Sequence, residues 1–150
     1  MNARAVYLTT MLHVADVRRS IDFYRLLGLE LTDLEGESTC PVWARMHSEG
    51  GDLMLLLEET PMEGVQRPFS LYLYTDELVA LREHLLASGI EVSEISRPDY
   101  MKSGEISMAD PDGYGLFIGQ WGTAEHRHWE RARRERLAEL RAHKTQLSGR

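Results

Sequence analysis

Two segments of this 150-residue chain repeat one pattern about 60 residues apart. The first runs from Asp16 to Gly28, and the second runs from Asp76 to Gly89. Each begins with an acidic residue suited to cap a helix, continues for about three helical turns, and ends at a glycine before an apolar run. The offset persists at the ends of the repeats, where Asp52 corresponds to Asp112. The chain is therefore expected to fold as two copies of one unit around a pseudo-twofold axis, with a cleft between them.

Runs of apolar residues bounded by turn residues predict four strands around each helix. In the first unit they cover residues 5–14, 29–33, 41–46 and 53–58; in the second they cover 69–75, 90–95, 105–109 and 114–120. A stretch with Pro61, Gly64 and Pro68 separates the two units and predicts a linker. The predicted fold class is therefore α+β: two tandem βαβββ units, at about 5–58 and 68–120, form a cupped mixed sheet around a cleft.

The last part of the chain differs in composition. Residues 125–146 contain no Gly or Pro and are rich in Ala, Arg, Glu and Leu, which predicts one long helix. We therefore divide the chain into a domain at 1–122 and a C-terminal basic helix at 123–150. Residues 1–120 carry 9 Lys+Arg against 20 Asp+Glu, whereas residues 121–150 carry 8 against 4. This basic helix suits packing on an acidic face of its own body or of a second copy, and it equally suits a solvated helix.

Composition also limits the partners and the compartment. The acidic body argues against nucleic acid as the main partner. No apolar run approaches the roughly 18 residues that cross a bilayer, so no membrane partner is expected. The N-terminal residues lack the pattern of a signal peptide, and the single Cys40 excludes an internal disulfide. We therefore expect a cytoplasmic protein.

Two segments carry a resemblance to a known family. The stretch from Leu12 to Glu30, with its Asp16 and its Phe23-Tyr24, resembles the opening signature of the vicinal oxygen chelate superfamily. The stretch Asp110-Pro-Asp-Gly-Tyr-Gly-Leu-Phe-Ile resembles its closing signature. That superfamily contains glyoxalases, bleomycin-resistance proteins and extradiol dioxygenases. The resemblance covers about four-fifths of the chain and implies the paired βαβββ fold and a homodimer, but it does not select one chemistry.

The resemblance also implies where a metal would bind. Enzymes of this superfamily hold a divalent metal through four side chains, usually His and Glu, on the first and last strands of each unit. Carried over by position, these four sites are Thr9, Leu55, Ser70 and Phe117. None is a His or a carboxylate, and hydroxyls alone are poor ligands. We therefore expect no bound metal and no cofactor.

Alternation along the strands extends this set into a lining for the cleft. If Thr9 faces the cleft, Met11 and His13 face it too, and Ser70 brings Tyr72 and Tyr74. Trp43 on the third strand and Tyr100 in the 96–104 loop complete the set. The candidate ligand-binding residues are Thr9, Met11, His13, Trp43, Leu55, Ser70, Tyr72, Tyr74, Tyr100 and Phe117. The aromatic residues of this set could instead be part of the hydrophobic core. The sequence assigns no catalytic residue.

Aromatic and aliphatic walls with a few hydroxyls suit a mostly apolar ligand. We therefore predict a metal-free binding protein of the glyoxalase/bleomycin-resistance type, which sequesters or senses a hydrophobic or aromatic compound such as an antibiotic. One alternative is a lyase, isomerase or dioxygenase whose non-standard metal site uses His13, His47 and Glu105. Another is an accessory domain whose basic helix binds a protein. The sequence leaves open whether the cleft lies within one chain or is shared between two.

Overall fold

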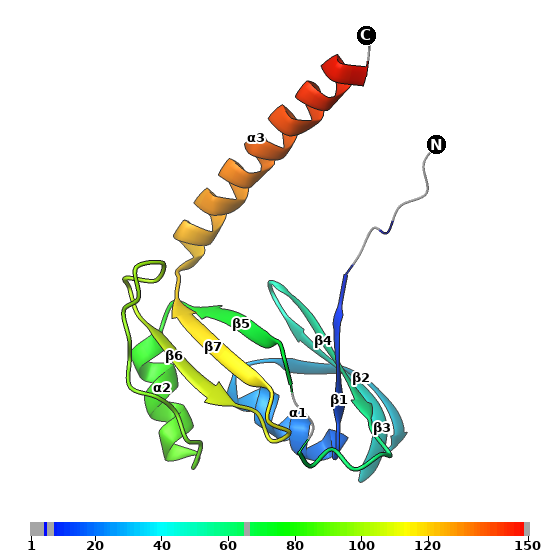
Figure 1. The fold of residues 1–150 in the computed structure, drawn as a ribbon. Coiled ribbons are helices and arrows are strands. Elements are labelled where there is room, and N and C mark those ends of the chain that lie inside the picture. Colours follow the sequence, from blue (N-terminus) through cyan, green and yellow to red (C-terminus); the bar gives the residue numbers. More distant parts are fainter. Residues whose placement is uncertain (1–4, 6–7, 65–66, 149–150) are drawn as a thin grey trace.

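The computed structural model describes residues 5, 8–64 and 67–148, the last three by backbone alone (Figure 1). The elements are β1 (Thr10–Val14), α1 (Val17–Leu26), β2 (Glu30–Glu37), β3 (Cys40–Ser48), β4 (Gly51–Leu57), β5 (Ser70–Thr75), α2 (Leu78–Ala87), β6 (Glu105–Ala109), β7 (Gly115–Gln120) and α3 (Thr123–Ser148). The predicted α+β class and the long C-terminal helix are confirmed. None of the described helices combines the length and the apolar character that crossing a bilayer requires.

Each unit builds its own sheet. The first sheet has the strand order β1-β4-β3-β2, and the second has β5-β7-β6. In both, the first strand of the unit pairs in parallel with its last strand, as the internal repeat requires. Helix α1 packs on strands of the first sheet, and α2 packs on β6 and β7. One face of each sheet is thus covered by a helix, and the opposite face, here called the open face, is not.

The hydrophobic core lies between the sheets and their helices. Alternate residues of each strand point toward the helix, so Leu12 and Val14 of β1 are fully buried while Met11 and His13 are exposed. The same face of the second sheet buries Ile106, Leu116 and Ile118. Burial of one such side chain contributes about 1.5–3 kcal/mol. The core therefore determines which face of each strand remains open.

Strand prediction differs from the structure at three places. Strand β2 continues to Glu37, four residues beyond the predicted 29–33. The first strand begins only at Thr10, and Val6 and Tyr7 lie outside the described residues. Residues 90–95 form no strand; a single bridge joins Ser96 to Glu105. Side chains take the place of a regular ladder there: Ser93 Oγ accepts the Ser107 N–H at 2.9 Å, and Arg82 Nε donates to the Ser93 carbonyl at 2.8 Å. The Ser93 N–H also donates to the Ser107 carbonyl at 3.0 Å, so the segment lies beside β6 without forming a continuous ladder.

The helix ends follow the predicted pattern in three of four cases. Asp16 accepts the Arg19 N–H at 3.0 Å, and Gly28 and Gly89 end their helices at φ 86° and 81°, where only glycine is unstrained. The prediction that Asp76 caps α2 is wrong, because the capping residue is Glu77 and its side chain makes no capping bond. Gln120 of β7 supplies the cap instead, since its Oε1 accepts the Leu78 N–H at 2.9 Å.

A turn between β6 and β7, residues 110–113, joins the two units. The Tyr24 hydroxyl of α1 donates to Asp110 Oδ2 at 2.9 Å, and Asp110 Oδ1 accepts backbone N–H groups of the turn itself. Asp112 Oδ1 accepts the Ala15 N–H at 3.0 Å, and the Tyr114 hydroxyl donates to the His13 carbonyl at 2.8 Å. We call this set of contacts the latch. It holds the second unit against α1 and the end of β1.

The latch predicts a stability cost for removing one hydroxyl. Burial and the neighbouring Asp110 raise the pKa of Tyr24 far above its usual value, so the phenol stays protonated and remains a donor. Substitution Tyr24→Phe should lower the free energy of unfolding by about 1–3 kcal/mol, because Asp110 Oδ2 loses its buried partner. Urea denaturation measures the change. Tyr74→Phe, at a side chain that is 55% exposed, is the control and should shift stability by less than about 0.5 kcal/mol. Equal effects would show that the latch contributes nothing specific.

Candidate functional site

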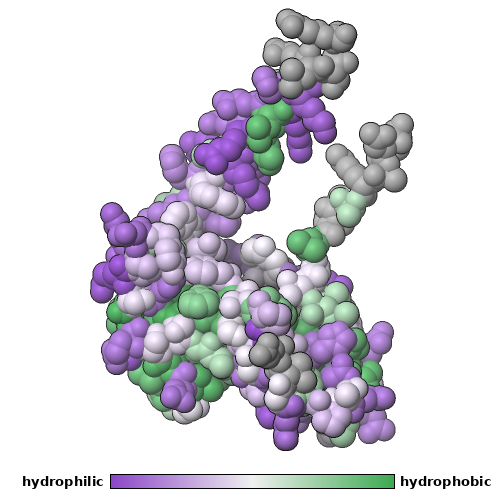
Figure 2. Space-filling view, in the orientation of Figure 1, coloured by the Kyte–Doolittle hydropathy of each residue, from purple (hydrophilic) through white to green (hydrophobic). Residues whose placement is uncertain are grey.

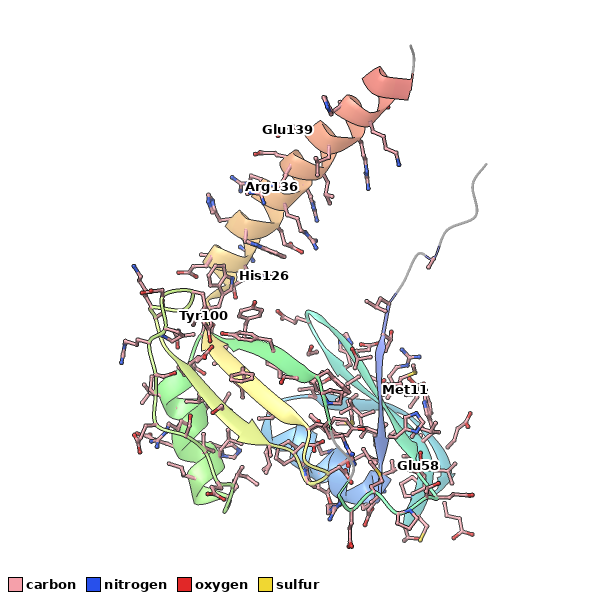
Figure 3. The ribbon with its side chains drawn as sticks, viewed as in Figure 1. Met11, Glu58, Tyr100, His126, Arg136 and Glu139 are labelled. Atoms are coloured by element: carbon pink, nitrogen blue, oxygen red, sulfur yellow. The ribbon has the colours of Figure 1, made fainter. Side chains whose placement is uncertain are left out.

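The open face of the first sheet combines apolar and charged side chains. Strand register places Met11 beside Met54, and His13 beside Leu56. Trp43 lies opposite Leu56, and Arg45 lies opposite Met54. Figure 3 shows Met11 on the side of β1 turned away from the second sheet. Met11, His13 and Trp43 therefore share the open face of the first sheet, and their contact with a ligand stays a prediction.

The direction predicted for Leu55 is wrong. Leu55 is fully buried, pairs with Leu12 and belongs to the core beneath α1. Its neighbours Met54 and Leu56 are the β4 residues that line the open face. The run from Leu53 to Leu57 has no polar residue that shows which side of the strand is exposed. Alignment of the superfamily's metal position one residue away from its true place therefore assigned a core residue to the open face.

Asp52 organises the polar end of this face. It lies 3.1 Å from Arg45 Nη1 and 2.7 Å from His47 Nδ1. The hydrogen bond with His47, and then that with Arg45, lowers the pKa of Asp52. Arg45 also lies near Asp33 and over the Trp43 ring, with the guanidinium carbon 5.8 Å from the ring centroid. Arg45 is therefore held by two carboxylates that balance its charge and by an aromatic ring on which it lies.

A second His–carboxylate pair lies at the other end of β1. His13 Nδ1 is 3.0 Å from Glu58 Oε2, and the Thr60 N–H donates to Glu58 Oε1 at 3.0 Å. The Thr60 N–H and then His13 lower the pKa of Glu58, so this carboxylate remains ionised beside the imidazole. Both groups are solvent-accessible, and the pair orients the ring without burying it.

The open face of the second sheet is aromatic. The Tyr72 and Phe117 rings are nearly parallel, with centroids 6.1 Å apart, and Tyr72 and Tyr74 are 5.2 Å apart. Trp121 extends the row, with its ring 5.9 Å from that of Tyr74. Ser70, Tyr72 and Tyr74 alternate with Leu71 and Leu73 as predicted, so strand alternation identified this face correctly. Trp121 was missed because it follows the last strand.

A buried carboxylate lies at one end of this aromatic row. Glu105 of β6 is only 5% exposed and accepts two phenol hydroxyls, from Tyr72 at 2.5 Å and from Tyr100 at 2.8 Å. The first contact spans β7, where Gly119 lies between the two strands. A Cβ at position 119 would lie 3.1 Å from the Tyr72 hydroxyl and 2.8 Å from Met101 Cε. The glycine therefore leaves the space through which Tyr72 reaches Glu105.

The four positions that the superfamily uses for metal do not fit a metal here. Thr9 and Ser70 offer only hydroxyls, the side chains of Leu55 and of its neighbours Met54 and Leu56 carry no oxygen or nitrogen donor, and the Phe117 ring faces Tyr72. Within residues 5, 8–64 and 67–148, no three His, Cys, Asp or Glu side chains gather closely enough to hold a metal ion. In particular, His13, His47 and Glu105 each have a separate partner and do not form the predicted alternative site.

Two shallow grooves occur among the described residues. One, of about 420 Å³, lies between the end of α1 and the α2–β5 side, and is lined by Leu26, Leu27, Leu73 and Leu81 among others. The other, of about 550 Å³, lies beside the irregular segment at 89–93 and the β6–β7 turn. Both follow seams between the units. Tyr74 of the aromatic row also lines the first groove, whereas the other three rings of the row and the two His–carboxylate pairs line neither groove.

Comparison with known proteins identifies the family. The sequence model of the Glyoxalase/Bleomycin resistance protein/Dioxygenase superfamily matches residues 7–117 of this chain. The chain belongs to this superfamily. No curated protein sequence matches it significantly.

Solved structures of this superfamily have the same fold. TnmS3, an antibiotic binding protein from Streptomyces sp. CB03234, is 23% identical, with a TM-score of 0.60 over 79% of this chain and 98% of that one. A bleomycin-binding protein complexed with bleomycin is 17% identical, with a TM-score of 0.60 over 79% and 100%. Lactoylglutathione lyase from Agrobacterium tumefaciens is 18% identical, with a TM-score of 0.56 over 79% and 95%. At these identities, the similarity shows the fold alone.

The corrected strand directions on β4 lead to a paired prediction. Leu55→Ala should lower the free energy of unfolding by about 2–5 kcal/mol, because it removes fully buried contacts and leaves a cavity. Leu56→Ala, one residue further along the same strand but on the open face, should cost about 1 kcal/mol or less. Chemical denaturation of both variants checks the direction of each side chain. A larger loss for Leu56→Ala would reverse the assignment of the two faces.

Proposed function

We propose that this protein is a metal-free binder of small hydrophobic or aromatic molecules, which it sequesters or senses in the manner of antibiotic-resistance proteins. The observation that carries the proposal is the row of partly exposed aromatic rings, Tyr72, Tyr74, Phe117 and Trp121, on a sheet face that no helix covers. Exposed aromatic faces bind planar ligands by stacking and by burial of apolar area. The four positions at which a Lewis acid would bind lack suitable donors, so binding without chemistry suits this site best.

Similar structures support a ligand-binding role. TnmS3 is described as an antibiotic binding protein, and another similar structure holds bleomycin. We propose that this chain binds a ligand of the same general class, a small antibiotic-like molecule, without assigning a particular compound. We also place the protein in the cytoplasm, because Cys40 is its single cysteine and is exposed, which suits a reducing compartment.

We further propose that each binding cleft is shared between two copies of the chain. The latch joins the second unit to α1, which covers the helix side of the first sheet, and to the end of β1. The open face of the first sheet is on the side opposite to α1, and the second unit joins the α1 side, so we infer that this open face does not oppose the aromatic row of its own chain. In a homodimer, the first sheet of one copy can face the second sheet of the other and close a cleft.

Helix α3 is proposed as an appendage to the domain at 1–122 and as a contributor to the dimer. It projects away from both sheets, and Figure 2 shows its surface as largely hydrophilic. Trp129, Leu137 and Leu140 are nevertheless exposed along it. Its excess of Arg complements the acidic body, so a second copy is the partner that we favour for this helix.

Metal analysis and ligand screening test the binding proposal together. Protein purified without a tag, after growth with added Mn, Fe, Ni and Zn, should contain far less than one metal per chain by elemental mass spectrometry. In thermal-shift assays, one or more members of a panel of aromatic antibiotics that includes bleomycin should raise the Tm by several degrees, since a ligand at 100 times its Kd adds about 2.7 kcal/mol. Phe117→Ala should abolish the shift, and Val79→Ala, on the exposed side of α2, should retain it. One tightly held metal per chain would refute the metal-free proposal.

Mixing two variants tests the shared cleft. Trp43→Ala on the first sheet and Phe117→Ala on the second should each abolish binding of the best panel compound in a homodimer. If the cleft is shared, a dimer of one copy of each variant has one cleft with both substitutions and one cleft with neither. Refolding the two variants together should therefore restore binding at one of the two clefts in each mixed dimer. If each cleft lies within one chain, every site keeps one substitution and binding stays lost. Light scattering should report a dimer throughout.

A further inference from the structure

Building on the proposed binding function, we propose that the open face of the second sheet selects organic cations: a ligand that joins a planar apolar group to a positive charge, which lies over Tyr72 and Tyr74 and beside Glu105. A neutral aromatic ligand uses only the stacking surface of this face. The preference for a cation depends on three features of the described residues: an uncompensated carboxylate, hydroxyls that can only accept, and exposed aromatic faces.

The carboxylate of Glu105 lacks a cationic partner. It is 5% exposed, yet none of the ion pairs found among the described residues includes it. The two basic residues of the adjacent loop, Arg97 and Lys102, are exposed and do not pair with it. A buried carboxylate is usually paired with a cation, because its charge is costly to remove from water. A bound cation would supply the missing opposite charge.

The two tyrosines on Glu105 present oxygen lone pairs to a ligand. Each phenol has one proton, and both protons are donated to Glu105. Burial and then the contact with Glu105 raise the pKa of Tyr72, and the hydrogen bond to Glu105 is the main cause that raises the pKa of Tyr100. Both hydroxyls therefore remain protonated toward Glu105 and can only accept from a ligand. Ammonium and guanidinium groups donate and do not accept, so they match this surface.

The ring faces add to the same preference. Tyr72 is 39% exposed and Tyr74 is 55% exposed, with Phe117 and Trp121 continuing the row. The face of an aromatic ring is electron-rich, and a cation within about 6 Å of its centroid is attracted. Tyr100 lies in the loop near the start of α3 and is itself 70% exposed (Figure 3), so one of the two phenols on Glu105 is accessible to a ligand. Aromatic ring faces are the features by which proteins recognise quaternary ammonium groups, and here they lie beside a carboxylate.

A matched pair of probes tests the proposal. N-Methylquinolinium and quinoline have nearly the same shape, and in weakly alkaline buffer only the first is charged. Isothermal titration calorimetry with the full-length protein should show about tenfold tighter binding of the cation. Glu105→Gln should remove this preference while quinoline binding stays within about twofold. Glu91→Gln makes the same change in net charge at an exposed position outside the row and should leave the preference intact.

A second variant keeps the test valid if Glu105→Gln fails to fold. Tyr74→Leu replaces an exposed ring with an apolar side chain that has no π-face, so cation binding should fall several-fold more than quinoline binding. Equal affinities for the two probes in the wild type would overturn the cation proposal and leave the proposed function standing. An equal loss of preference in Glu105→Gln and Glu91→Gln would also overturn it, since general electrostatics would then suffice. Failure of both probes and of every panel compound to bind would overturn both proposals.

Discussion

The carboxylates of one turn determine how the two halves of this protein meet. Asp110 accepts a phenol of α1 and two N–H groups of its own turn, and Asp112 accepts the N–H of Ala15. Asp110 lies in a buried position, which raises its pKa, and it is stabilised only by donors that the fold brings to it. These contacts attach the second unit to the helix-covered side of the first. Both open faces therefore remain uncovered, and every proposal about binding depends on that arrangement.

The two units have diverged in how they use the same scaffold. The first sheet has four regular strands, and its open face neutralises Arg45 between Asp33, Asp52 and Trp43. The second has three, because Ser93 and Arg82 satisfy the backbone that would have joined a fourth. Its open face is aromatic, with a single carboxylate under two phenols. If two copies face each other as proposed, a ligand would lie between a mixed polar wall and an aromatic wall.

The sequence was sufficient to orient the aromatic residues of the second sheet, but it gave the wrong direction for Leu55 on the first sheet. Tyr72 and Tyr74 alternate with leucines on a short strand, so one reference position was enough to orient them. Leu55 lies in a run of five apolar residues, where alternation is invisible and an error of one residue moves a side chain to the opposite face. The Glu105 contacts with Tyr72 and Tyr100 were not foreseen. The contact with Tyr72 joins residues 33 positions apart and depends on the space above Gly119.

The amino-acid pattern was sufficient to predict the repeated unit, its helices, most of its strands and the superfamily. These depend on local periodicity, on glycines with positive φ and on short signatures. Each of these signals involves only residues that are close together in the sequence. The side chain that caps α2, the loss of one strand, the direction of Leu55 and the contact of Glu105 with Tyr72 depend on groups that are more distant in the chain. Such contacts form only when strands take a particular register and when buried polar groups find donors across it. The tertiary structure alone therefore decided which carboxylate lies beside exposed aromatic rings and which faces are left for a ligand.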